Sequence, residues 1–180
     1  DSTVIANKMG HLNFSRFIQD CFWDLSDITL KYGAEIYQFV GDEAVITWKV
    51  SKNFDYEKCI ALYFSYKELL ESKSDFYMQK YQTTPNFRCA VHSGKVSAAL
   101  VGDYKKEIAY HGNVLNLGSR LQKTCKEHNA DILISEDFSD NLKDHWYGLT
   151  PITLHHLKGI NDIQTAYKVC EENKKYYFYL

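Results

Sequence analysis

The sequence is poor in features that would place the protein in a membrane or in an oxidising compartment. It has no apolar run near the roughly 20 residues that a membrane-spanning helix needs, and no signal peptide is recognisable. Its five cysteines form neither a Cys-x-x-Cys pair nor a Cys/His cluster with zinc spacing. We therefore expect buried, reduced thiols in a cytoplasmic protein. Only two prolines occur, so long helices and strands are possible.

An excess of either charge is also missing. The net charge is −2, so no field over the whole chain attracts nucleic acid or an anionic membrane. A phosphate ligand would have to be held by a few local groups. With 180 residues, 45% of them hydrophobic, the chain is long enough for a real core. We expect one domain over residues 1–180.

Apolar residues recur at helical spacing in several segments. The first, from Val4 to Lys31, predicts one long helix or two with a break near Gly10. The polar stretch Ser72–Asn86 is expected to be a loop. The remaining predicted helices cover Tyr56–Leu70, Asn113–Glu127 and Glu136–Leu142.

Runs rich in β-branched and aromatic residues predict the strands. Glu35–Val40 and Ala44–Trp48 are separated by three residues typical of a tight hairpin. The order of elements predicts an α+β fold, with helices on one face of a largely antiparallel sheet. If a strand precedes Ser2, the chain begins as the ferredoxin-like βαββαβ unit. The other predicted strands are Phe87–His92, Val96–Val101, Asp131–Ser135, Trp146–His155 and Thr165–Val169. The short stretch Glu107–Tyr110 is expected to lead into the helix that begins at Asn113.

Asp42 follows Gly41 at the tip of the predicted hairpin. A carboxylate on such a rigid turn suits Mg²⁺, which takes a few carboxylates together with substrate phosphates. Gly-Asp is also ordinary turn chemistry, so the pattern alone leaves both interpretations open.

Asn116 and Arg120 are four residues apart on a predicted helix and therefore share one face. An amide beside a guanidinium suits a sugar-phosphate, because the guanidinium can neutralise charge on phosphate oxygens. An ordinary solvated helix face would have the same pattern. Lys158, next to Gly159 in a predicted loop, could reach a phosphate, although Lys-Gly is common in loops.

Taken together, these segments resemble the class III adenylate and guanylate cyclase catalytic domains. The resemblance covers nearly the whole chain, in the family's order and spacing. The segments that carry it are Ile36-Tyr-Gln-Phe-Val-Gly-Asp-Glu-Ala-Val-Ile, Arg88-Cys-Ala-Val-His-Ser-Gly-Lys-Val, Tyr110-His-Gly-Asn-Val-Leu-Asn-Leu-Gly-Ser-Arg-Leu, Ile132-Leu-Ile-Ser and Leu157-Lys-Gly-Ile.

The resemblance implies a role for each of these positions. Asp42 would be the second of two aspartates that bind two Mg²⁺ (or Mn²⁺) ions. Asn116 and Arg120 would orient the ribose and stabilise the transition state. Lys158 would bind the terminal phosphates. Ser2 and Thr3 would lie in a phosphate-binding turn that follows the first metal aspartate.

The sequence departs from the family pattern at two places. The first metal aspartate would lie three residues before Asp1, so we expect the first strand and one metal ligand upstream of the given chain. The two positions that read the base hold Gln38 and Ala109. Gln38 can donate to and accept from a purine edge, whereas alanine cannot. Adenine is the expected base because no glutamate is present to bind guanine.

The resemblance therefore implies a nucleotide cyclase that makes cyclic AMP and pyrophosphate from ATP (or acts on GTP) at the interface of a homodimer. An upstream sensory or membrane segment is a further expectation. Ala109 and Gln38 leave open a non-catalytic, nucleotide-binding domain. A GGDEF-type diguanylate cyclase fits poorly, because Val40 and Ala44 replace the glycine and phenylalanine that its motif requires.

Overall fold

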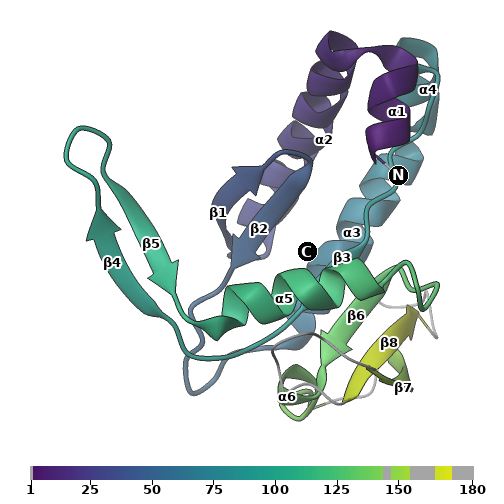
Figure 1. Cartoon of the computed structure of the whole chain (residues 1–180). Helices are drawn as coiled ribbons and strands as arrows, with labels where there is room; N and C mark the ends of the chain where they lie inside the picture. The colour runs from purple at the N-terminus through teal and green to yellow at the C-terminus, as the bar shows by residue number, and fades with distance from the viewer. Residues whose placement is uncertain (1, 144–146, 155–164, 172–180) are drawn as a thin grey trace. The chain divides into compact units, whose positions relative to one another are not determined.

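Gly10 divides the first helical segment in two, as the sequence predicts. The helices on either side are α1 (Ser2–Met9) and α2 (His11–Lys31), and Gly10 has a φ of 81°, a left-handed value that favours glycine. These elements belong to a computed structural model that describes residues 2–143, 147–154 and 165–171 (Figure 1). The chain divides into two units, Asp1–Phe87 and Arg88–Leu180.

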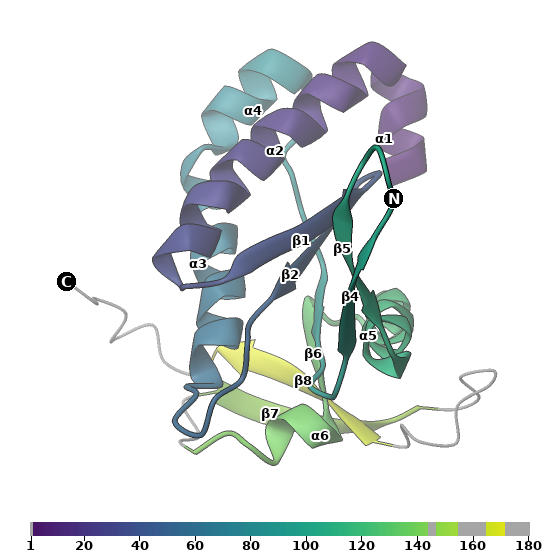
Figure 2. The ribbon, with the colours of Figure 1, turned by 90° about the vertical axis from the view of Figure 1, so that its left-hand side faces the viewer.

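The first unit has helices on one side of a β-hairpin. After α1 and α2 come β1 (Glu35–Val40), β2 (Glu43–Thr47), α3 (Glu57–Ser72) and α4 (Ser74–Tyr81). Its core is built from apolar and aromatic side chains of α2, α3 and α4, with Ala44, Ile46 and Trp48 packed against it. Figure 2 shows the hairpin lying beside α2. The buried core residues are Phe17, Ile18, Cys21, Leu25, Ala34, Leu62, Tyr66, Leu70, Tyr77 and Tyr81.

Helix α4 corrects the predicted loop over Ser72–Asn86. Tyr77 and Tyr81 are four residues apart and both are buried, so the helix has one apolar face. Their hydroxyls donate to Asp24 and Asp20 of α2 at 2.9 and 2.6 Å. The polar composition of this stretch favoured a loop, but its tertiary contacts with α2 stabilise a helix.

The second unit contains a four-stranded sheet in the order β3-β6-β8-β7. Strands β3 and β6 are parallel, and the other two pairs are antiparallel. A separate hairpin, β4-β5, lies in the same unit. The elements are β3 (Cys89–Val91), β4 (Ser97–Val101), β5 (Glu107–His111), α5 (Asn113–Thr124), β6 (Ile132–Ser135), α6 (Glu136–Ser139), β7 (Tyr147–Thr153) and β8 (Thr165–Glu171).

Helix α5 packs on this sheet through Leu117 and Leu121, and Cys125 directly after the helix joins them in one cluster with Leu133 of β6 and Ala166 of β8. The thiol of Cys125 also donates to the carbonyl oxygen of Cys89 at 3.3 Å. Burial raises the pKa of the Cys125 thiol to about 11, so it stays protonated and packs as a small apolar group.

The mixed α+β class is confirmed. Over the described residues, however, the strands form three sheets, and not the one largely antiparallel sheet that was expected. The hairpins β1-β2 and β4-β5 pair locally, and β3-β6 is parallel. The strand expected before Ser2 stays a prediction.

Two other expectations concern cysteines and membranes. All five cysteines are free, but Cys170 is exposed and Cys89 is half-buried, so burial was wrongly predicted for these two. Burial raises the pKa of Cys21 to about 12. Within the described ranges, no helix combines the length and apolar character needed to cross a bilayer.

Candidate functional site

Asp42 lies in the two-residue turn that joins β1 to β2, where Val40 pairs with Glu43. Gly41, the first of the two turn residues, has a φ of 63°, a left-handed value, as in the tight turns typical of β-hairpins. The Asp42 side chain is half-buried. The predicted position of this carboxylate, on a rigid hairpin tip, is confirmed.

Gln38 projects from the face of the hairpin that points away from α2. Its neighbour Phe39 pairs with Ala44 and stacks on Phe22 of α2, with 4.6 Å between ring centroids. Since adjacent strand residues point to opposite faces, Gln38 and its partner Val45 lie on the other face. Gln38 is exposed and can meet a ligand from outside the unit.

Ser2 and Thr3 form the first turn of α1, with Ser2 half-buried and Thr3 exposed. The first backbone N–H groups of a helix have no partner within the helix, and they attract anions. The structure thus places these two residues at a helix start. Their phosphate-binding role stays a prediction.

Asn116 and Arg120 are four residues apart in α5 and therefore project from the same face, one turn apart. Asn116 is exposed and Arg120 is half-buried, while Leu117 and Leu121 point into the core. The apolar side of the helix therefore fixes the direction in which the amide and the guanidinium project. This pair is the part of the predicted site that the structure brings together most clearly.

Ala109 lies in β5, paired with Ala99 of β4, and is half-buried. Its methyl group offers no hydrogen bond to a base. Lys158 falls outside the described residues. The predicted residues thus form one group on the β1-β2 hairpin and α1, in the first unit, and another on α5 and β5, in the second.

The donor set suits a hard divalent cation only in part. Asp42 supplies one carboxylate oxygen ligand of the kind that Mg²⁺ takes. Across the residues that the structure describes, no three His, Cys, Asp or Glu side chains gather closely enough to hold a metal ion by themselves. A metal at Asp42 would therefore need further ligands beyond this carboxylate.

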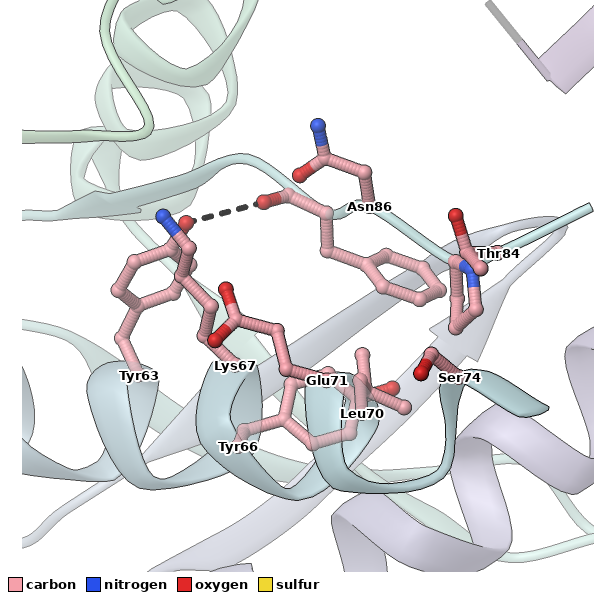
Figure 3. A pocket seen from close by; sticks show the side chains of 10 residues that line it. Tyr63, Tyr66, Lys67, Leu70, Glu71, Ser74, Thr84 and Asn86 are labelled. Carbon is pink, nitrogen blue, oxygen red and sulfur yellow. Dashed lines mark hydrogen bonds between the residues drawn. The ribbon is translucent and has the colours of Figure 1, made fainter. Parts of the chain in front are cut away.

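A pocket of about 410 Å³ opens elsewhere in the first unit, between α3 and residues 84–87 (Figure 3). Tyr66, Leu70 and Phe87 form its apolar wall, and the Tyr63 hydroxyl donates to the carbonyl oxygen of Phe87 at 3.1 Å. Glu71 lies at the rim, in view of the same space. Of the predicted site residues that the structure describes, none lines this pocket.

Comparison with known proteins identifies the family. The sequence matches the profile "Adenylate and Guanylate cyclase catalytic domain" over residues 1–178. It is 33% identical over 142 residues to Adenylate cyclase 2 of Rhizobium meliloti (strain 1021). That alignment covers 79% of this chain and 39% of the relative, so the chain spans well under half of the relative's length.

Solved structures have the same fold. The adenylyl cyclase CyaB from P. aeruginosa superposes with a TM-score of 0.80 at 20% identity, over 96% of this chain and 90% of that one. The guanylate cyclase domain of RhGC from Catenaria anguillulae, solved with GTP, also gives 0.80, at 19% identity over 95% and 91% of the two chains. At these identities the likeness establishes the fold alone. The match over residues 1–178 does more: this chain belongs to the family of adenylate and guanylate cyclase catalytic domains.

Proposed function

We propose that this domain converts ATP to 3′,5′-cyclic AMP and pyrophosphate, in a signalling pathway of the cytoplasm. Membership of the cyclase family carries the proposal, together with the placement of Asn116 and Arg120 side by side on α5. The 33% identity to a protein named as an adenylate cyclase favours ATP over GTP. Position 38 holds glutamine and not the glutamate that would bind guanine, which supports the same choice.

In the proposed reaction the ribose 3′-oxygen attacks the α-phosphorus in line. A bond forms between these two atoms, the bond from the α-phosphorus to the bridging oxygen breaks, and pyrophosphate leaves with that electron pair. The proton of the 3′-hydroxyl is lost to solvent. Two divalent ions held by Asp42 and the upstream aspartate would lower the pKa of the hydroxyl and grip the triphosphate.

The chain's own residues would supply orientation and charge. Asn116 would hold the ribose so that the 3′-oxygen lies close to the phosphorus and in line with it. Arg120 would meet the negative charge that develops on the transferring phosphoryl group. Lys158, Ser2 and Thr3 would bind the terminal phosphates. Gln38 would contact the adenine edge, and Ala109 would leave room for it.

A homodimer follows from the division of roles. The resemblance to the family implies that each site is shared by two subunits. One subunit would supply the metal-binding aspartates, and the other would supply the asparagine and the arginine. This chain carries both halves, so two identical chains related by a twofold axis would make two equivalent sites. Asp42 of one protomer would then face the partner subunit's Arg120 across the nucleotide.

The decisive experiment is an assay of the full-length protein, with its upstream sequence, on ATP and GTP with Mg²⁺ and with Mn²⁺. We expect cyclic AMP to be the main product. An excess of cyclic GMP over cyclic AMP would make the protein a guanylate cyclase. Nucleotide binding without any cyclic product would favour the second candidate, a non-catalytic cyclase-like domain. Ala109, which cannot read a base, is the observation that keeps this alternative open.

A further inference from the structure

The segment His92–Val96, which leaves β3 and leads into β4, passes very close to the start of α5. A Cβ atom placed on Gly94 would lie 2.4 Å from Cγ2 of Val114, in the first turn of that helix. Atoms that are not bonded do not approach so closely, so any side chain at position 94 would have to displace Val114 or the segment. The backbone of Gly94 itself lies outside the left-handed range, so space is the reason for glycine there.

A second close approach lies one residue before the helix. Gly112 has a φ of 149°, and a Cβ on it would lie 3.0 Å from the carbonyl oxygen of Lys95 and 3.6 Å from Cα of Val96. The segment therefore lies against the start of α5 at two places, the side chain of Val114 and the backbone of Gly112. Because the branched side chain of Val114 has few rotamers open to it in a helix, the segment constrains where the helix begins.

The other side of the segment is fastened to the start of α6. Nδ1 of His92 and the hydroxyl oxygen of Ser135 are 2.8 Å apart, and the Ser93 hydroxyl donates to the carbonyl oxygen of Asp137 at 3.1 Å. Ser135 is 1% exposed, and its oxygen also accepts the backbone N–H of Phe138 as the cap of α6. These hydrogen bonds join the segment to the buried Ser135 and, at the surface, to Asp137 in the first turn of α6.

Helix α5 carries this contact directly to the candidate site. Val114, which meets Gly94, lies two residues before Asn116 and six before Arg120. With a rise of about 1.5 Å per residue, Asn116 is about 3 Å along the axis from the contact. Leu117 and Leu121 pack against the sheet and hold the later turns of the helix in place. A steric displacement of Val114 would therefore tilt the first turn and move Asn116.

We infer that His92, Ser93 and Gly94 act together as a brace that positions Asn116 and Arg120 for the reaction. They are positioning residues, because they act through α5 and need no contact with the nucleotide. The kinetic part of this inference rests on the proposed function. The structural part, that the brace sets the placement of the Asn116 side chain, stands without it.

The test is a double-mutant cycle at positions 94 and 114 of the full-length protein, in which the side chains are enlarged and shortened. Gly94→Ala adds the methyl group that collides with Val114, and Val114→Ala removes the atom that it meets. We expect Gly94→Ala to lower kcat by about tenfold or more, with a smaller change in KM, because displaced reacting groups slow the chemical step. In Gly94→Ala/Val114→Ala we expect kcat to return to within about threefold of Val114→Ala alone.

Gly118→Ala is the matched control. It adds the same methyl group to α5 about 200° around the helix from Asn116, and no heavy atom lies within 4 Å of the new Cβ. We expect it to keep the wild-type kcat. A merely structural brace would lower the melting temperature of Gly94→Ala while kcat per folded molecule stays unchanged, and that result would overturn the inference.

A readout independent of activity separates this inference from the proposed function. In ¹H–¹⁵N spectra the side-chain amide signal of Asn116 should shift in Gly94→Ala and return in the double variant. If the wild-type protein makes no cyclic nucleotide, the proposed function fails, and an unmoved Asn116 signal is what refutes the brace. Should Gly94→Ala not fold, Ser93→Ala, which removes one bond to α6, should shift the same signal.

Discussion

The hydroxyl of Tyr77 donates a 2.9 Å hydrogen bond to Oδ2 of Asp24, and so joins α4 to α2. Tyr77 is completely buried and Asp24 is 7% exposed. The ammonium group of Lys73 contacts the other carboxylate oxygen of Asp24. A buried carboxylate with a donor on each oxygen is well satisfied, and the buried Tyr77 hydroxyl would be costly to leave without an acceptor.

We predict that Asp24→Ala destabilises the protein by about 1–3 kcal/mol, because it leaves the buried Tyr77 hydroxyl without its acceptor. Chemical denaturation in urea measures the change. Asp27→Ala, on the exposed side of the same helix, is the control, and we expect it to change stability by no more than about 0.5 kcal/mol. Equal effects of the two substitutions would show that the contact with α4 contributes nothing.

Stability should fall with acidification through His92. Burial lowers the pKa of this imidazole below its usual 6.5, and the charge of Asp137 opposes the shift only in part. The unfolded chain then binds a proton more readily than the folded one. The contribution of His92 to the free energy of unfolding is fully present above pH 6.5. It decreases as the pH falls from there through the lower pKa of the folded state.

The measurement is the free energy of unfolding at pH 7.5 and at pH 5.5, in the wild type and in His92→Gln. We expect the decrease between the two pH values to be smaller in His92→Gln, because the titrating group has gone. A His92→Gln variant with the full wild-type pH dependence would contradict the assignment.

Arg120→Ala should lower kcat by about 10²–10³-fold, the cost typical of losing one group that stabilises transition-state charge. Binding of ATP, measured by calorimetry, should change far less, since the proposed contact strengthens only as the reaction proceeds. Lys123→Ala removes a different, exposed cation from the same helix and should leave kcat unchanged. Turnover by Arg120→Ala at the wild-type rate would refute the role given to the guanidinium.

Mixing two inactive variants tests the homodimer. If each site takes Asp42 from one protomer and Arg120 from the other, a mixed dimer of Asp42→Asn and Arg120→Ala has one site with both defects and one intact site. Random exchange makes half of the dimers mixed, so the mixture should recover about a quarter of wild-type activity. Recovery to no more than the sum of the separate variants would place both residues of a site on one chain.

The sequence was sufficient for the features that have local causes. The break at Gly10, the hairpin turn at Gly41 and the common face of Asn116 and Arg120 each follow from a few neighbouring residues, and the structure confirms them. Helix α4 could not be predicted in this way. Its polar residues become favourable in a helix only because Asp20 and Asp24, far earlier in the chain, receive them.

Asp20 illustrates why such contacts are hidden from a local pattern. Burial alone would raise the pKa of its carboxyl, but hydrogen bonds from Lys80 and Tyr81 outweigh that effect and hold the pKa below its usual value. Lys80 and Tyr81 follow Asp20 by 60 and 61 positions in the sequence. The importance of Gly94 is equally hidden, because only the packed structure brings Val114 against it.

The pairing of β1 with β2 is irregular between Ile36 and Gln38: Ile36 pairs with Ile46 and Gln38 with Val45, which leaves Tyr37 as an extra residue in one strand. From Gln38 to the turn the ladder is regular. The strand therefore has a place where its length can change by one residue while Asp42 keeps its register with the opposite strand. Insertions and deletions among homologous cyclases should be tolerated at this point of the hairpin and excluded between it and the turn.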